Sequence, residues 1–178
     1  NDFTPDTSIT IERVRINGVT FDGGVTPVNV RCLYNDVEVS GCTFKNVIGA
    51  AREVTACQFY MDGQSDQVAY QAVGNVKFSG NHVERVVQRN TNGDSTSGNN
   101  YECCGFRGGG QNVQVLGNKF KDITGVDFDC EAIYTKAVRY MITDNICKNA
   151  GTEEGAINAK GISPENSQSG SSAPGYWG

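Results

Sequence analysis

The chain has few of the residues that bind zinc, cross membranes or bind nucleic acid. It contains one histidine, His82, and no C-x-x-C pair, so a zinc site would have few ligands to draw on. No apolar run approaches the roughly 18 residues that a membrane-spanning helix needs. Lys and Arg number 15 against 20 Asp and Glu, and this net charge of -5 disfavours nucleic acid, whose phosphates require clustered basic side chains. Neutral or basic carbohydrate remains compatible with this composition.

The composition is also poor in the Ala, Leu, Glu and Lys that fill helices and rich in Gly, with 22 among 178 residues. This length suffices for one domain with a hydrophobic interior. Seven cysteines is an odd number in a chain too long for a small disulfide scaffold, so we interpret them mostly as small buried thiols, which suits synthesis in a reducing cytosol. The chain opens at Asn1 without a signal-peptide pattern, which predicts a processed product or a piece of a longer protein.

One short pattern recurs along the chain, and its clearest copy is V-Q-V-L-G-N-K-F-K-D-I at 113–123. Alternating apolar residues precede a Gly-Asn pair, and alternation resumes after it. The copies are 14–22, 37–47, 53–59, 76–86, 113–123 and 140–150. Anchored on Ile16, Val39, Val54, Phe78, Val115 and Ile142, they follow at steps of 23, 15, 24, 37 and 27 residues. Such self-similarity is typical of a solenoid, although the 15-residue step indicates either a shortened turn over 48–62 or a copy out of register.

Two further columns support stacked turns of chain. Asn81, Asn118 and Asn145 occupy one column, together with Cys42 and Cys57 in earlier copies, and stacked carboxamides are expected to hydrogen-bond along the axis. A-I-Y-T-K at 132–136 and A-I-N-A-K at 156–160 predict a second strand of each turn. Gly and Asn suit a left-handed corner between strands, and each strand would pair with its counterpart in the next turn, about 4.8 Å away.

These patterns predict an all-β fold, a single-stranded parallel β-helix of about six coils over residues 1–162. A Ser/Gly/Pro-rich C-terminal segment, 163–178, follows as a tail or subunit contact. The repeats resemble the right-handed, pectate-lyase-like β-helix superfamily over roughly residues 9 to 160. Neither end shows a capping-helix pattern, so we expect the missing chain of a longer β-helix, or partner subunits, to cover the ends.

The main candidate for chemistry is V-D-F-D-C-E-A at 126–132. In an extended strand Asp127, Asp129 and Glu131 share one face at steps of about 6.5–7 Å. Carboxyl pairs about 5–5.5 Å apart suit retaining glycoside hydrolysis, and pairs about 6.5–9.5 Å apart suit the inverting route. Two other interpretations stay open: a solvated acidic edge, and a Ca²⁺ site with oxygen ligands. No other metal or cofactor is predicted.

Glu102 is a further catalytic candidate because it lies just before a strand one coil earlier. Polar loops at 87–101 and 61–67 would carry binding residues on a rigid frame. The candidate substrate-binding residues are Asp62, Asp66, Tyr101, Arg107 and Tyr134. His82 is expected to be structural, and R-G-G-G-Q at 107–111 to be a bend between strands.

Two branches of the superfamily offer resemblances in function. D-F-D-C-E-A-I at 127–133 is similar to the Asp-Asp-Cys-x-Ala-Ile signature of polygalacturonases, with Phe128 as an extra residue. The irregular coils, polar loops, unpaired cysteines and uncapped ends more closely resemble bacteriophage tailspikes and capsule depolymerases. That resemblance implies a homotrimer of the virion tail, or an extracellular protein, that binds and hydrolyses a bacterial surface polysaccharide. The alternatives are a non-catalytic adhesive or structural β-helix and a polysaccharide lyase.

Overall fold

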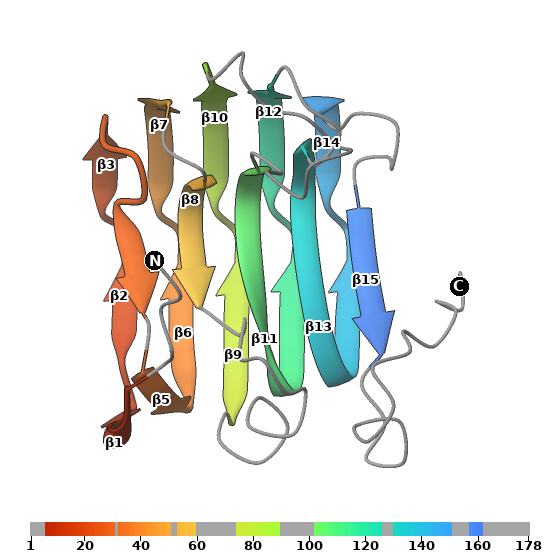
Figure 1. Cartoon of the computed structure of the whole chain (residues 1–178). Helices are drawn as coiled ribbons and strands as arrows, with labels where there is room; N and C mark the ends of the chain where they lie inside the picture. Colours follow the sequence, from red (N-terminus) through yellow and green to blue (C-terminus); the bar gives the residue numbers. More distant parts are fainter. Residues whose placement is uncertain are drawn as a thin grey trace, which may run out of the picture.

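The computed structural model describes residues 6–30, 32–50, 53–59, 74–89, 102–125, 130–150 and 157–161. Within these ranges every regular element is a β-strand, and the strands stand side by side in one stack (Figure 1). The first eight are β1 (Asp6–Glu12), β2 (Arg15–Asn17), β3 (Thr20–Asp22), β4 (Val28–Val30), β5 (Cys32–Asn35), β6 (Val37–Ser40), β7 (Thr43–Gly49) and β8 (Glu53–Phe59). The others are β9 (Asn75–Ser79), β10 (His82–Gln88), β11 (Glu102–Leu116), β12 (Lys119–Thr124), β13 (Cys130–Thr143), β14 (Ile146–Ala150) and β15 (Ile157–Gly161). The predicted all-β class is confirmed for this part of the chain.

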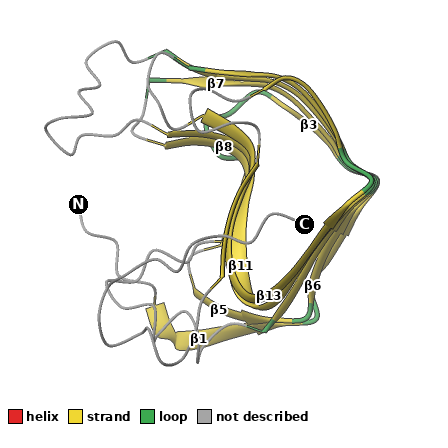
Figure 2. Ribbon diagram, turned by 90° about the vertical axis from the view of Figure 1, so that its right-hand side faces the viewer, coloured by secondary structure: helices red, strands yellow, loops and turns green. Residues whose placement is uncertain are grey.

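The strands form two main sheets, and every strand pair is parallel. The larger sheet has the order β15-β13-β11-β9-β6-β2, and β8 pairs with both β11 and β4. The smaller sheet has the order β14-β12-β10-β7-β3, and β1 pairs with β5. A strand of the smaller sheet follows each of β2, β6, β9, β11 and β13 along the chain, and strands of successive repeats pair with one another. Viewed along the stack, the strands superpose into one curled outline (Figure 2).

The core lies between the sheets because the apolar residues of each strand alternate with polar ones. In β6 and β9 the alternate residues Val37, Val39, Val76 and Phe78 are buried. The Phe78 ring stacks on Phe106 at 4.6 Å between centroids, and it also packs between Phe44 and Phe120 at 6.1 and 6.2 Å. Aromatic neighbours from successive repeats thus form a continuous stack, which adds to the burial of apolar surface.

The Gly-Asn pairs lie at the corner between the two sheets. Gly18, Gly41, Gly80 and Gly117 have φ between 60° and 66°, the left-handed region that glycine adopts without a Cβ clash. Asp144 takes the same place in the last repeat, with a φ of 59°. The amide of each of these four glycines donates to a carbonyl of the next repeat, for example Gly80 to Leu116 at 2.9 Å. The predicted corner is confirmed.

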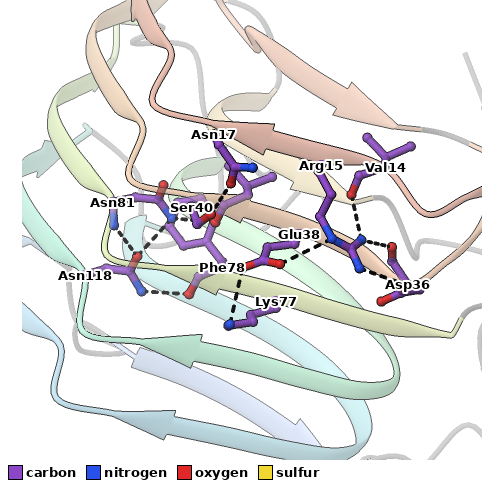
Figure 3. A network of polar contacts seen from close by, with 11 residues as sticks. Val14, Arg15, Asn17, Asp36, Glu38, Ser40, Lys77, Phe78, Asn81 and Asn118 are labelled. Carbon is purple, nitrogen blue, oxygen red and sulfur yellow. Dashed lines mark hydrogen bonds and ion pairs between the residues drawn. The ribbon is translucent and has the colours of Figure 1, made fainter.

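The asparagine column is confirmed as a hydrogen-bonded ladder, part of which is drawn in Figure 3. Asn118 Oδ1 accepts from Asn81 Nδ2 at 3.0 Å and from the Asn81 amide at 2.9 Å. Asn145 Oδ1 accepts from the same two groups of Asn118, at 2.9 and 3.0 Å. Each Nδ2 also donates to a carbonyl one repeat back, as Asn118 does to Phe78 at 3.0 Å. Cys42 lies in the same column one repeat before Asn81, and its backbone amide donates to Asn81 Oδ1 at 2.9 Å.

The predicted register is wrong at residues 53–59. The aligned column is Ile16, Val39, Phe78, Val115 and Ile142, so Val54 is not a member. Instead β8 pairs with the first half of β11, and Cys57 lies beside Phe106 and Val28 rather than in the asparagine column. The predicted steps from Val39 to Val54 and from Val54 to Phe78 are therefore a single repeat from Val39 to Phe78. This repeat is longer than the others because it includes β8 and the residues between β8 and β9. The second predicted column is confirmed, because Ile133 pairs with Ile157 and Lys136 with Lys160.

The sequence predicted that residues 107–111 form a bend between two strands, and the structure differs. They lie inside β11, which is continuous from Glu102 to Leu116 and curves strongly (Figure 2).

Among the described residues no helix has the length and apolar character needed to cross a membrane.

Candidate functional site

A set of polar side chains lies on β8, β11 and β13, where the larger sheet curves. We call Glu53, Thr55, Gln58, Arg107, Glu131 and Tyr134 the polar cluster. Five of them lie in two rows across the three strands, because Gln58, Arg107 and Tyr134 are register partners, as are Thr55, Cys104 and Glu131. Glu53 lies at the start of β8, so all six residues are on strands.

Arg107 is the centre of the first row. Its Nη1 lies 3.5 Å from Glu53 Oε1, and its guanidinium carbon lies 5.0 Å from the centre of the Tyr134 ring. The Arg107 side chain is only 9% exposed and that of Glu53 only 18%. A guanidinium with so little water around it interacts more strongly with a carboxylate and with a ring face than it would at the surface. These contacts fix the position of Arg107.

Gln58 adds an amide to the same group. Its Nε2 donates to Glu53 Oε2 at 3.2 Å, so both oxygens of the Glu53 carboxylate are held, one by Gln58 and one by Arg107. Gln58 itself is fully buried. The Glu53 carboxylate is thus oriented by Gln58 on its own strand and by Arg107 on the adjoining β11.

Glu131 is the polar end of the second row. It is 2% exposed, and its Oε2 lies 3.3 Å from Sγ of Cys104, which donates to it. Along β13 it stands three residues before Tyr134, about 10 Å at the usual rise of a strand. Glu131 therefore reaches the same curved part of the sheet from the strand that carries Tyr134.

The structure brings four of the nine predicted site residues onto two neighbouring strands. Glu131 and Tyr134 lie on β13, and Arg107 and Glu102 lie on β11. The backbone of Glu102 pairs with that of Glu53. The other five lie outside the described residues: Asp62, Asp66, Tyr101, Asp127 and Asp129. Whether Asp127 and Asp129 share a face with Glu131 stays a prediction.

Sequence reasoning missed Glu53 and Gln58. Their segment, E-V-T-A-C-Q-F, was aligned with the corner column, which placed it on another part of the sheet. Ala56 at the corner position was the signal against that alignment, since every other aligned copy has Gly or Asp there, in the left-handed conformation. Aligned with A-I-Y-T-K instead, the segment would have been placed in register with the parts of β11 and β13 that bear Arg107 and Tyr134.

Five of the seven cysteines are buried inside the protein. Cys42, Cys57, Cys103, Cys104 and Cys130 are buried, and Cys103 and Cys130 are register partners. A hydrogen bond with the Cys130 thiol and burial both raise the pKa of Cys103 far above its usual value, and burial does the same for Cys57. Cys57 and Cys103 therefore stay protonated and unreactive as nucleophiles at neutral pH. Among the described residues no three His, Cys, Asp or Glu side chains gather as a metal site would require.

The exposed face of the smaller sheet carries paired charges. Lys121 Nζ lies 2.6 Å from Glu84 Oε1, and Lys45 Nζ lies 3.1 Å from Asp22 Oδ2. The Lys121 ammonium lowers the pKa of Glu84, and the Asn46 amide together with Lys45 lowers that of Asp22. His82, at the start of β10, lies 3.4 Å from Glu84, as a structural role predicts. These charges pair with one another along the stack, so the polar cluster is the stronger candidate for a site.

Comparison with protein-family models, with curated proteins and with solved structures finds no match to this chain. The family resemblance stated from the sequence therefore stays a prediction. The polar cluster and the arrangement of the strands are the features that bear on function.

Proposed function

We propose that this chain is a right-handed parallel β-helix of the tailspike type, which binds a bacterial surface polysaccharide at the polar cluster and hydrolyses it. Support for the β-helix comes from parallel strands that alternate between two sheets and from corners that stack in register. The homotrimer and the location in a virion tail, or outside the cell, follow from the same resemblance and stay predictions. Sedimentation of the purified chain would test the trimer.

The observation that carries the proposal is the arrangement around Arg107. A buried guanidinium contacts both the Glu53 carboxylate and the Tyr134 ring, and Glu131 stands on the same strand as that ring. Sites for sugars combine a few fixed polar groups with an aromatic surface on which an apolar ring face can lie. A rigid sheet holds such groups more accurately than a loop does.

Hydrolysis of a glycosidic bond requires two carboxyl groups, one to protonate the leaving oxygen and one to attack the sugar or activate water. Glu131 and Glu53 are the described candidates, and the proposal assigns the acid/base role to Glu131. Gln58 and Arg107 orient Glu53 as its partner. Asp127, Asp129 and Glu102 stay candidates for either role, with Asp62, Asp66 and Tyr101 as further binding residues.

Glu131→Gln and Glu53→Gln test the assignment against extracted bacterial polysaccharides. Loss of an acid/base carboxyl is expected to lower the yield of new reducing ends at least about 100-fold while binding persists. Glu84→Gln, on the exposed face of β10, is the matched control and should cleave like the wild type. A thermal melt of each variant separates lost chemistry from lost folding. An undiminished yield in both site variants would remove these residues from the mechanism.

Two alternatives have distinct readouts. A lyase would leave an unsaturated sugar that absorbs ultraviolet light, whereas a hydrolase would not. A non-catalytic rod is favoured by the asparagine ladder and the paired surface charges, which need no ligand to be satisfied. A rod would leave the viscosity of every polysaccharide solution unchanged.

A further inference from the structure

The Gln58 side chain has an acceptor with no partner. Its Nε2 donates to Glu53, but within the described part of the chain Oε1 makes no hydrogen bond, although the residue is fully buried. The contact with Glu53 also sets the orientation of the amide. A flipped side chain would place an amide oxygen against a carboxylate oxygen, which repels. The atom of Gln58 that has no partner is therefore the oxygen Oε1, and only a hydrogen-bond donor can satisfy it.

Thr55 provides a second polar atom of this kind. Its Oγ1 is buried and, among the described residues, has no hydrogen-bond partner. Most buried side-chain polar atoms in native proteins are paired, and an unpaired one requires an explanation such as a bound water or a ligand. Two unpaired atoms on one strand, β8, indicate a place where a polar ligand binds.

The charges of the polar cluster limit what that ligand can be. Glu53 and Glu131 are acidic, and Arg107 is the basic residue among the six. Its guanidinium already faces the Glu53 carboxylate and the Tyr134 ring. A carboxylate, sulfate or phosphate on the ligand would lie near the like charge of the Glu53 carboxylate in a poorly hydrated place, where repulsion is strong. Such a group would also bring acceptors to Gln58 Oε1, which is itself an acceptor.

Building on the proposed function, we infer that the polar cluster takes a neutral, hydroxyl-rich polysaccharide and rejects acidic ones. A sugar hydroxyl donates to Gln58 Oε1, and Thr55 Oγ1 exchanges a hydrogen bond with a neighbouring hydroxyl. Unlike an anionic group, a hydroxyl can donate and adds no charge next to Glu53 and Glu131.

Matched polymers test this selectivity with the full chain. Polygalacturonate, alginate and hyaluronan are each compared with their carboxyl-reduced products, in which every carboxylate has become a primary hydroxyl. Affinity electrophoresis is expected to show at least tenfold tighter binding of the reduced member of at least one pair. Tighter binding of the acidic members would overturn the inference and leave the proposed function standing. Binding to none of the six polymers, nor to neutral glucans and mannans, would count against both.

Gln58→Met tests the residue itself, because it keeps the length of the side chain and removes the amide. The change removes an unsatisfied buried oxygen but also the Nε2 bond to Glu53, so the two effects offset each other and little change in melting temperature is expected, while affinity for the neutral polymer falls at least tenfold. Thr55→Val should act in the same direction. Gln88→Met is the control: Gln88 is 2% exposed at the end of β10 and has interaction partners, so the change should lower the melting temperature and leave binding unchanged. Full affinity in both Gln58→Met and Thr55→Val would overturn the inference.

Discussion

Left-handed backbone positions recur at two places in each repeat. The first is the corner, where glycine dominates. The second lies within the strands of the smaller sheet, where Asn46, Arg85, Asp122 and Asn149 have φ between 51° and 61°. Asn and Asp tolerate this conformation because their short side chains bond locally, whereas Arg85 has no such advantage. Side-chain bonds offset part of the cost, for example from Arg85 Nη1 to Asn46 Oδ1 at 3.2 Å.

Gly117→Ala is expected to destabilise the protein through the backbone alone. A Cβ at this position meets no atom within 4 Å, yet φ is +62°, a conformation that costs an L-residue about 1–2 kcal/mol. Urea unfolding should show a loss of that size. The control is Asp144→Gly at the equivalent corner, which relieves the same strain and should not destabilise. Equal stability of Gly117→Ala and wild type would contradict the account.

Lys121→Met is expected to raise the pKa of Glu84 back toward its ordinary value. The Lys121 ammonium holds the pKa of Glu84 down, and Glu84 in turn raises that of Lys121. Because the pKa of Glu84 is lowered in the folded state, its stabilising effect is present above the ordinary carboxyl pKa and is lost as pH falls through the lowered value. NMR titration of the side-chain carboxyl measures the shift, which salt should also reduce. Since the pair is exposed, little change in melting temperature is expected.

Three strands of the smaller sheet, β10, β12 and β14, follow directly after an asparagine of the ladder. The ladder satisfies backbone and side-chain groups that the corner would otherwise bury without partners. Asn118 is fully buried and bonds to the repeats on both sides, whereas Asn145 is half-buried in the last described repeat. The same residue type therefore contributes differently according to its place along the stack.

Asn118→Ala is expected to lower the free energy of unfolding by about 3–5 kcal/mol, because each buried group left unpaired costs about 1–3 kcal/mol. The Asn81 amide and the Phe78 carbonyl both lose a partner. Asn145→Ala should cost less, since water can reach its neighbours. Chemical denaturation of the two variants provides the comparison. Equal losses would show that position along the stack does not matter.

In the whole molecule, burial increases from the ends of the stack toward its middle. Val113 and Val115 are 1% and 0% exposed, while Tyr140, one repeat later in the same column as Val113, is 36% exposed. Phe21 in the first repeat is half-buried, whereas Phe44 is fully buried. A stack of parallel strands buries its inner repeats between neighbours on both sides, and its end repeats on one side only.

Phe78→Ala is expected to cost about 3–5 kcal/mol, the usual range for a buried phenylalanine. The change removes ring contacts with Phe44, Phe106 and Phe120 at once. Phe21→Ala, in the first repeat, should cost clearly less because Phe21 is only half-buried and, among the described residues, its ring stacks on that of Phe44 only. Urea unfolding of both variants measures the gradient. A larger loss at Phe21 would indicate that the ends hold the stack together.

Much of the fold could be predicted from the sequence because the patterns that indicate strands and corners span only a few consecutive residues. Alternation in V-Q-V-L and V-K-F-S predicted strands with one buried face, and Gly117 and Asn118 predicted a left-handed corner followed by a ladder. Side-chain alternation and tolerance of positive φ are properties of a few consecutive residues. Of the site, Arg107, Tyr134 and Glu131 were selected because aromatic, basic and acidic residues stood near predicted strands.

The partner of each strand was decided by tertiary packing. Val39 pairs with Phe78 and not with Val54, because the cost of closing a longer loop grows slowly with length while a matched corner adds buried hydrogen bonds. This pairing of strands places Glu53 and Gln58 next to Arg107 and so forms the polar cluster. No pattern among neighbouring residues in the sequence predicts it. Residue type and spacing determined that this chain would form stacked strands. Contacts between residues far apart in the chain determined which polar groups would meet.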